Sequence, residues 1–467
     1  MTVLAREDAP AQAPAPGAAH RPGVPPGSGQ VMVRDGLSMT LSAGLTAAVG
    51  LLAWIAAARL LPRHDVGRAA AFVSGFMLVA SLGDLGLDRA LMRWVPWAGR
   101  HRRSLVQRCY AAVLAASFVA ALAVLLLPAG AEIRAAEPGP GLVLFVGASM
   151  SWALFQFQDP VLVSLGRARW VPWENVSIGV ARVVILVVAA PLLGAGGVLL
   201  SWVVPAAGGV IVVSVLVRRV LAAEQAPAGA GSAGAGSAGA GSAGAGRLPG
   251  RREVLGLLGP IYPARVCSAI VVNLVPLLVT SRFGSAAGAV FFIAWMAGNT
   301  VDYAAISFAQ SVTVRIAHEP ERAWPLLVLG GRKVAMFFGP ALVLGALLAG
   351  PLLSVFGPAY AGLGTTLLRL VLLGCIPRLL TTLVLALTVA RGRGWLAGAL
   401  EGAGAVAVTG VAALVPKGAL TQIGIGFVAV QVAVAAAAGI ALLQFRRTTA
   451  SRFAARRGRL ADPQKES

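Results

Sequence analysis

The chain has 467 residues, of which 57% are hydrophobic and only 12% are charged, and its mean hydropathy is +0.80. A soluble domain carries roughly 25% charged residues, so the composition excludes an ordinary soluble protein. The net charge of +21 would suggest a nucleic-acid partner in a soluble chain, but the arginines lie in short gaps between long apolar runs. We therefore expect a protein of the lipid bilayer that binds no nucleic acid.

Residues 1–37 are rich in Ala, Pro and Gly and lack the order of a signal peptide, so we expect a disordered cytoplasmic tail. Apolar runs of about 20 residues follow, and runs of this length cross a bilayer as helices because lipid offers no partner to the backbone. Twelve spans are predicted, at 39–58, 67–87, 109–128, 141–165, 176–194, 196–217, 257–280, 289–312, 334–356, 364–390, 395–415 and 422–444.

The spans predict an all-α polytopic membrane protein with about twelve transmembrane helices in two six-helix pseudo-repeat bundles. Between the halves, the sequence AGAGS occurs three times in succession, which is typical of a flexible spacer. The predicted units are a tail at 1–37, an N-terminal bundle at 38–217, a flexible cytoplasmic linker at 218–252, a C-terminal bundle at 253–445 and a basic cytoplasmic tail at 446–467.

The basic residues predict the orientation. With the N-terminus in the cytoplasm, most of the 39 Lys and Arg residues lie on the cytoplasmic side, as the positive-inside rule requires. The opposite side then receives Arg59, Arg63, Arg68, Arg134, Arg282 and Lys417. We expect a multi-pass protein of the cytoplasmic membrane with both termini in the cytoplasm.

Charged residues inside spans are costly and usually face a partner or a cavity. Asp159 and Arg182 share one depth on consecutive antiparallel helices, and Arg265 and Asp302 repeat this arrangement in the second half. We expect a salt bridge in each pair. A cavity-lining role for Arg265 stays open, because three prolines interrupt its helix.

Two further arginines lie on the tenth predicted span. Arg378 lies near the middle of the bilayer and follows Pro377, and we expect it to face a central cavity unless it is tethered to the shallower Glu401. Arg369 lies nine residues earlier, on the opposite face of a straight helix, so it reaches the same cavity only if Pro377 bends the helix. The alternative for Arg369 is that it extends to the membrane surface.

The sequence shows no catalytic or metal-binding constellation. The three cysteines have no metal-ligand spacing, and the four histidines lie outside the spans. There is no HExxH, GxSxG or P-loop pattern. We therefore expect no cofactor, no metal and no enzymatic activity.

Two stretches carry a family resemblance. The stretch ARLLPRHDVGRAAAFVSGFMLVASLGDLGLDRALMRWVP, from Ala58 to Pro96, includes Asp84 and resembles the opening of polysaccharide flippases of the Wzx type. These belong to the multidrug/oligosaccharidyl-lipid/polysaccharide exporter superfamily. The stretch VFGPAYAGLGTTLLRLVLLG, from Val355 to Gly374, is similar to the junction of the ninth and tenth helices in that family.

The resemblance implies a flippase that moves polyprenyl-pyrophosphate-linked glycan across the cytoplasmic membrane, with polysaccharide assembly proteins as partners. The candidate substrate-binding residues are Arg378, Arg265, Arg369 and Arg182, and the candidates for ion coupling or structural pairing are Asp159, Asp302 and Glu401. Two alternatives stay open. One is a drug or cation antiporter of the same superfamily, although span 39–58 carries no charge to attract a cation. The other is an integral-membrane polysaccharide polymerase or glycosyltransferase.

Overall fold

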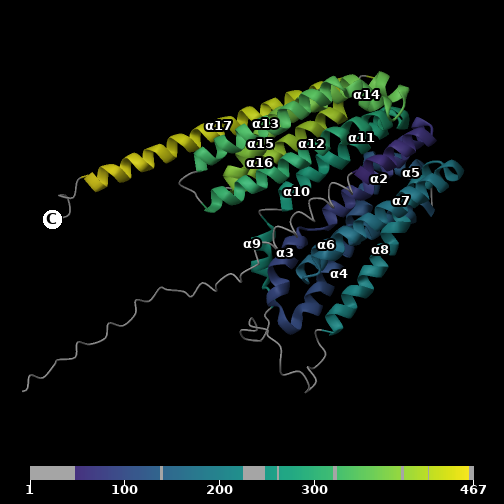
Figure 1. The fold of residues 1–467 in the computed structure, drawn as a ribbon, viewed down its shortest axis with the longest axis horizontal. Helices are drawn as coiled ribbons and strands as arrows, with labels where there is room; N and C mark the ends of the chain where they lie inside the picture. Colours follow the sequence, from purple (N-terminus) through teal and green to yellow (C-terminus); the bar gives the residue numbers. More distant parts are fainter. Residues whose placement is uncertain are drawn as a thin grey trace, which may run out of the picture.

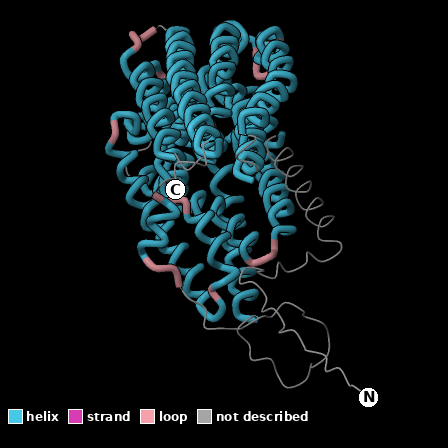
Figure 2. Tube along the Cα trace, turned by 90° about the vertical axis from the view of Figure 1, so that its left-hand side faces the viewer, coloured by secondary structure: helices cyan, strands magenta, loops and turns pink. Residues whose placement is uncertain are grey.

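The computed structural model describes residues 48–136, 140–223, 248–259, 262–318, 323–390, 394–418 and 420–461. Within these ranges the secondary structure is helical, and no strand occurs there (Figure 2). Ten helices are long and apolar enough to cross a membrane, and the shorter apolar helix Ala48–Leu60 opens the described chain. Together with the 34-residue helix α12 they confirm the expected all-α polytopic fold.

The first half contains seven labelled helices after Ala48–Leu60. They are α2 (Arg63–Gly83), α3 (Leu87–Trp94), α4 (Arg102–Leu126), α5 (Ala131–Ala136), α6 (Pro140–Ser164), α7 (Val171–Leu193) and α8 (Ala195–Ala223). Short 3-10 turns occur at Val95–Trp97, Gly99–His101, Pro128–Gly130 and Ala168–Trp170. The predicted inner loop after α2 is therefore largely helical.

The second half has the same alternation of long and short helices. They are α9 (Arg251–Leu258), α10 (Tyr262–Ala269), α11 (Val275–Phe283), α12 (Ser285–His318), α13 (Ala323–Leu347), α14 (Ala349–Ser354), α15 (Pro358–Ala390), α16 (Gly394–Leu414) and α17 (Leu420–Ala461). The last helix thus continues well beyond the predicted span at 422–444. The N-terminal tail and the AGAGS repeats lie outside the described residues.

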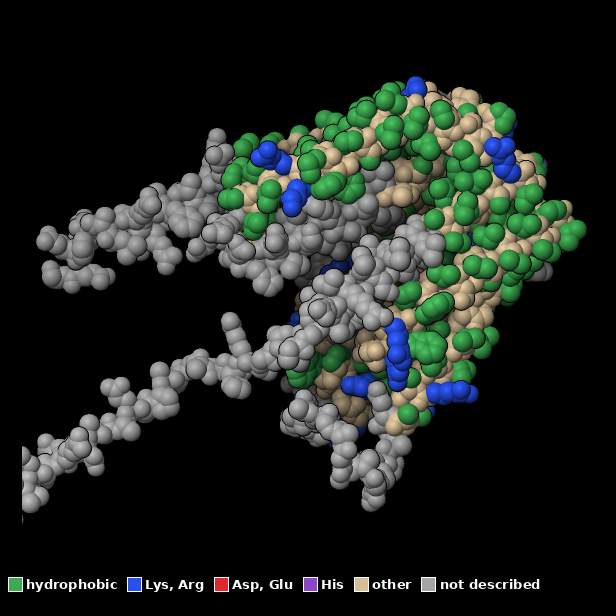
Figure 3. Space-filling model, viewed as in Figure 1, with side chains coloured by type: hydrophobic (Ala, Val, Ile, Leu, Met, Phe, Trp, Pro, Cys, Tyr) green, Lys and Arg blue, Asp and Glu red, His purple; other side chains and the backbone are tan. Residues whose placement is uncertain are grey.

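Two groups of helices make up the molecule. In Figure 1 the purple-to-teal helices and the green-to-yellow helices come together near α5 and α14 and diverge toward the opposite end. We call the meeting point the α14 end and the opposite end, which carries α3 and α9, the α3 end. On the face seen in Figure 3, hydrophobic side chains cover much of both groups. The surface is therefore suited to contact lipid along the length of the helices.

Helix α2 is the most buried span, with 78% of its most apolar window inside the protein. It packs against α4, α6 and α8 of its own half and against α11 and α12 of the other half. Small residues permit this, because helices in lipid associate by close packing and not by a hydrophobic driving force. A side chain at Gly67 would overlap the carbonyl oxygen of Ser285 at the start of α12, and one at Gly83 would overlap Ser117 of α4.

Helices α10 and α11 form one membrane span with an irregular centre. A π-helical turn, η5 (Ile270–Leu274), joins them, and the side-chain amide of Asn273 donates to the carbonyl oxygen of Ala269 over 3.3 Å. Such turns are rare and wider than an α-helix by one residue. The irregularity of this span lies in that π turn, and Pro276 follows it at the start of α11.

Candidate functional site

The seam between the two halves follows α2 along its whole length. At the α14 end the backbones of Gly67 and Ser285 nearly touch. Further along, the ring of Trp54 lies 4.6 Å from that of Phe292 on α12. At the α3 end the hydroxyl of Tyr262 donates to the carbonyl oxygen of Leu82 over 2.7 Å. Any motion of one half against the other must change these contacts.

An ion cluster joins the halves at the α3 end. One guanidinium nitrogen of Arg265 on α10 lies 2.9 Å from Asp84 Oδ2 and 2.7 Å from Asp88 Oδ1. The two carboxylates converge because the chain turns sharply after α2, with Leu85 (φ 52°) and Gly86 (φ 73°) in the left-handed region. We call Asp84, Asp88 and Arg265 the α2–α10 clasp.

Burial dominates the electrostatics of Asp84. It raises the pKa of this carboxyl above its ordinary value of 3.8, and the opposing attraction of Arg265 offsets that shift only in part. Asp88 adds a like charge that raises the pKa further, whereas hydrogen bonds from backbone amides, including that of Gly86, lower it. The net result is a pKa of about 6 for Asp84.

The clasp gives Arg265 partners that the sequence did not predict. The predicted acid was Asp302, whose side chain lies outside the described residues, so that pairing stays a prediction, while Arg265 binds Asp84 and Asp88. The prediction compared depths along neighbouring helices. Packing of α10 against α2 decides the direction in which Arg265 points, and depth alone does not contain that information.

A buried group of polar side chains occupies the N-terminal bundle. Asp159 Oδ2 accepts a hydrogen bond from the Asn175 side chain over 3.2 Å. The Gln158 amide donates to the Val210 carbonyl oxygen over 2.9 Å and to Ser214 Oγ over 3.2 Å. We call the following set the N-bundle polar cluster: Tyr110, Gln158, Asp159, Glu174, Asn175 and Ser214.

Several oxygens of this cluster have no partner among the described residues. They are Tyr110 Oη, Gln158 Oε1, Asp159 Oδ1 and both carboxylate oxygens of Glu174. Orphaned buried oxygens are costly, so such a group is suited to take up a proton, a water molecule or a cation. No group of three or more His, Cys, Asp or Glu side chains within the described ranges has the arrangement of a metal site. A multivalent metal is therefore not indicated by the cluster.

Arg182 does not form the salt bridge that we predicted with Asp159. Its guanidinium carbon lies 3.2 Å from the ring centre of Trp202 on α8, and its Nε is buried with no partner among the described residues. The reason is that α7 packs chiefly against α8 and only slightly against α6. The side chain consequently points to Trp202, which also contacts the rings of Trp54 and Trp152.

In the C-terminal bundle, Arg378 lies on the face of α15 that packs against α12 and α17. The thiol of Cys375 contacts the Gly298 carbonyl oxygen of α12, and a side chain at Gly374 would meet Phe427 of α17. Arg378 is three and four residues further along, which places it on the same helical face. It is half-buried, as is Glu401 on α16.

Arg369 has a structural contact at the α14 end. Its side chain is exposed, and its Nε donates to the carbonyl oxygen of Ala346, near the end of α13, over 3.0 Å. Arg59 and Arg282 do the same for the ends of α14 and α16, and Arg134 does so for α4. These guanidinium groups satisfy carbonyls that a helix end leaves unpaired.

The sequence prediction did not include Glu174, Asn175, Gln158 or Tyr110. Glu174 and Asn175 lie in the first turn of α7, where a polar residue is normally assigned to the membrane surface. One signal was available. Gln158 and Asp159 interrupt an otherwise apolar span just before the short loop that leads to Glu174, so the two acids face one another across that loop.

Comparison with known proteins identifies the fold. No protein-family model and no curated protein matches the chain in sequence. Among solved structures, an inward-facing multidrug resistance MATE family transporter of the MOP superfamily has a TM-score of 0.60 at 16% identity, covering 87% of this chain and 95% of that one. An outward-facing MATE structure has a TM-score of 0.55 at 15% identity, covering 90% and 96%.

A third structure, a MOP superfamily transporter from Pyrococcus furiosus, has a TM-score of 0.56 at 15% identity and covers 88% of this chain and 94% of that one. The polarity of the binding pocket of that transporter is reversed, which suggests a different function for it. Similarity at these identities concerns the fold alone. The chain therefore has the fold of the MATE transporters of the MOP superfamily, over nearly its whole length.

Proposed function

We propose that the protein is an alternating-access exporter of lipid-linked oligosaccharide or polysaccharide precursors. The observation that carries the proposal is the asymmetric seam along α2. One end is held by backbone contact at Gly67 and Ser285, and the other is held by the α2–α10 clasp. An ion cluster can separate and re-form, so the two halves are suited to rock about the α14 end.

An anionic substrate is supported by the arginines inside the bundles. Arg182 in the N-terminal bundle and Arg378 in the C-terminal bundle both lie within spans, where a cation is costly unless it serves a partner or a cavity. A guanidinium binds pyrophosphate oxygens through paired hydrogen bonds. Arg265, at the clasp, would meet the substrate only when the clasp separates. Arg369 is the weakest candidate, because it already caps α13.

The N-bundle polar cluster supports a coupling role for Asp159, with Glu174 as its neighbour. Two buried carboxyl groups with unpaired oxygens can hold one proton or monovalent cation between them. Asp302 and Glu401 remain further candidates for ion coupling or for structural pairing. The same cluster is the observation that favours the second candidate function, a drug or cation antiporter, because a cationic drug would seek acids in a buried site.

The proposal includes an orientation. The α3 end faces the cytoplasm and the α14 end faces outward, with both termini cytoplasmic and the AGAGS linker serving only as a spacer. The cytoplasmic membrane is the proposed location. Polysaccharide assembly proteins are the proposed partners, and the glycan-bearing polyprenyl pyrophosphate is the proposed cargo.

A transport assay with Arg378 variants tests the function. In cells or proteoliposomes, the protein should move a labelled polyprenyl-pyrophosphate glycan, and Arg378→Ala should abolish this while Arg378→Lys retains part of it. Efflux of a cationic dye is measured in parallel. Dye efflux without glycan movement would favour the drug or cation antiporter over the flippase. Recovery of glycan export in the Arg378→Ala/Glu401→Ala double variant would show that Arg378 only ties helices together.

A further inference from the structure

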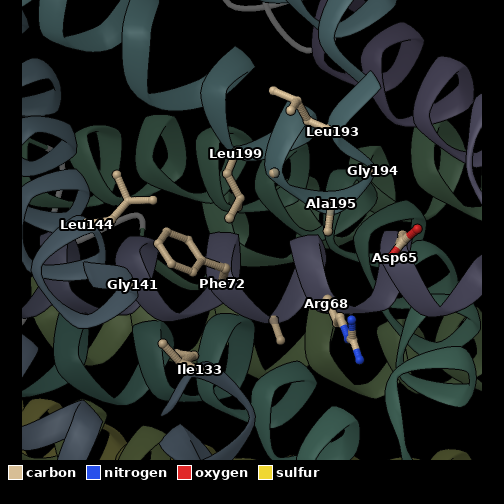
Figure 4. A pocket seen from close by; sticks show the side chains of 12 residues that line it. Asp65, Arg68, Phe72, Ile133, Gly141, Leu144, Leu193, Gly194, Ala195 and Leu199 are labelled. Atoms are coloured by element: carbon tan, nitrogen blue, oxygen red, sulfur yellow. The ribbon is translucent and has the colours of Figure 1, made fainter. Parts of the chain in front are cut away.

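A pocket of about 280 Å³ opens at the α14 end of the N-terminal bundle, away from the polar cluster and the clasp. It lies between α2, α5, α6 and the turn that joins α7 to α8. Figure 4 shows Phe72 projecting from α2 toward Leu199 and Leu144, with Arg68 and Asp65 following along the same helix. Its lining residues are Asp65, Arg68, Ala71, Phe72, Ile133, Gly141, Leu144, Leu193, Gly194, Ala195, Gly196 and Leu199.

The two charges of the pocket are one helical turn apart and do not pair with each other. Asp65 and Arg68 are neighbours on one face of α2, where oppositely charged residues commonly form a pair. Instead, Asp65 Oδ1 lies 3.3 Å from His64 Nε2, outside the pocket, and Oδ2 faces Gly194, where an added side-chain carbon would lie 3.2 Å away. The pocket therefore offers an acidic and a basic group to one ligand.

The walls and the rim are apolar. Phe72, Ile133 and Leu199 form the walls. Val143 and Leu192, which adjoin the lining residues Leu144 and Leu193 in sequence, are 75% and 78% exposed, as expected of side chains that meet lipid tails. The volume corresponds to about nine water molecules at roughly 30 Å³ each, which is too small for an oligosaccharide and suited to a lipid headgroup with the start of its chains.

We propose that this pocket binds phosphatidylethanolamine from the outer leaflet. The phosphate would accept hydrogen bonds from Arg68, and the primary ammonium, two carbons away, would donate to Asp65. Phosphatidylcholine has no N–H to donate, and phosphatidylglycerol has no cation, so Asp65 selects the ethanolamine headgroup. The site is separate from the proposed transport route, and only its assignment to the outer leaflet rests on the proposed orientation.

Native mass spectrometry of the full-length protein, delipidated in detergent and then given each phospholipid, tests the proposal. The wild type should retain phosphatidylethanolamine most tightly. Arg68→Gln should weaken that binding roughly tenfold, as loss of a charge-assisted hydrogen bond does. Asp65→Asn should reduce it to the level of phosphatidylcholine. Arg332→Gln, an exposed arginine on α13, is the matched control and should bind as the wild type does.

A variant that fills the pocket tests phosphatidylethanolamine binding without changing the charged residues. Leu199→Trp should displace phosphatidylethanolamine without altering Asp65 or Arg68, provided that the protein elutes as a single folded species. Equal retention of the three phospholipids by the wild type would overturn the proposal. Unchanged retention in both Asp65→Asn and Arg68→Gln would also overturn it. Neither result bears on glycan export, which is measured separately.

Discussion

The two ends of the seam between the halves are held by different kinds of contact. At the α14 end, the start of α2 meets the start of α12 at backbone distance, and arginines cap the ends of neighbouring helices. At the α3 end, the halves are joined by the side chains of Arg265, Asp84 and Asp88, with Tyr262 beside them. Packed backbones at Gly67 and Ser285 have no other partners to contact, whereas the groups of an ion cluster can exchange each other for water. We therefore expect the α14 end to stay fixed and the α3 end to adjust when the halves move.

The largest expected effect is at the fixed end. Gly67→Leu would place a side chain against the Ser285 carbonyl oxygen, and neither backbone can yield without moving α2 or α12. We expect a loss of about 3 kcal/mol or more of stability, or failure to fold. Thermal unfolding in detergent measures it. Gly147→Leu is the control, because nothing lies within 4 Å of a side chain there. Equal stability of the two variants would show that the α14 end is not tightly packed.

The second effect concerns the clasp. Arg265→Ala removes the cation that Asp84 and Asp88 share, so the attraction between the halves is lost there and the halves should separate further at the α3 end. Spin labels at Arg93 on α3 and at the exposed Trp395 on α16, the helix that packs against α10, would report a longer distance. The measurement uses a chain whose three cysteines are replaced by alanine.

A charge exchange sharpens this test. Arg265→Asp combined with Asp84→Arg should restore the short label distance, because the attraction across the seam is re-formed with opposite sign. Arg252→Ala on α9 removes an exposed arginine and should leave the distance unchanged. A distance that is insensitive to Arg265→Ala would mean that apolar packing, and not the clasp, holds the α3 end.

The third effect is a pH dependence of the same distance. The pKa of Asp84 is raised from 3.8 to about 6 by burial, so its contribution to folding stability is present below pH 4 and is lost as the pH rises through 6. The attraction to Arg265 has the opposite dependence, because it needs the carboxylate. Lowering the pH from about 7.5 to about 5 should therefore lengthen the label distance, but only in part, because Asp88 still attracts Arg265. Asp84→Asn should remove this response, and an unchanged response there would assign it to another group.

The smallest effect is at an arginine cap. Arg369→Gln should cost about 0.3–1 kcal/mol, because the exposed guanidinium stabilises only the last carbonyls of α13. A small decrease in the unfolding temperature, with glycan export unchanged, is the expected result. Loss of glycan export at normal stability would indicate that Arg369 binds substrate.

The sequence predicted the spans well and the contacts of their charged residues poorly. Apolar runs mark the spans, so nine of the ten spans fall close to the predicted ranges, whereas the span predicted at 334–356 lies at Ala323–Leu347. The pairing of Asp159 with Arg182 was wrong, because depth along two helices says nothing of their rotation, and α7 turns Arg182 toward Trp202. The clasp joins segments 180 residues apart, and no local pattern connects them. Glu174 was missed because it lies in the first turn of α7, where a polar residue is normally assigned to the membrane surface.

The π turn between α10 and α11 bears on how the clasp is aligned. It amounts to one extra residue in the middle of the span, and an α-helix advances about 100° per residue. Removing one residue from 270–274 would let the two segments join as a regular helix, at the cost of rotating the Arg265 segment against the Thr280 segment by that angle. Thr280, which packs against Gly288 of α12 in the same half, would keep its place, while Arg265 would turn away from Asp84. A single inserted residue thus sets the direction in which the α10 side chains point without changing that of the α11 side chains.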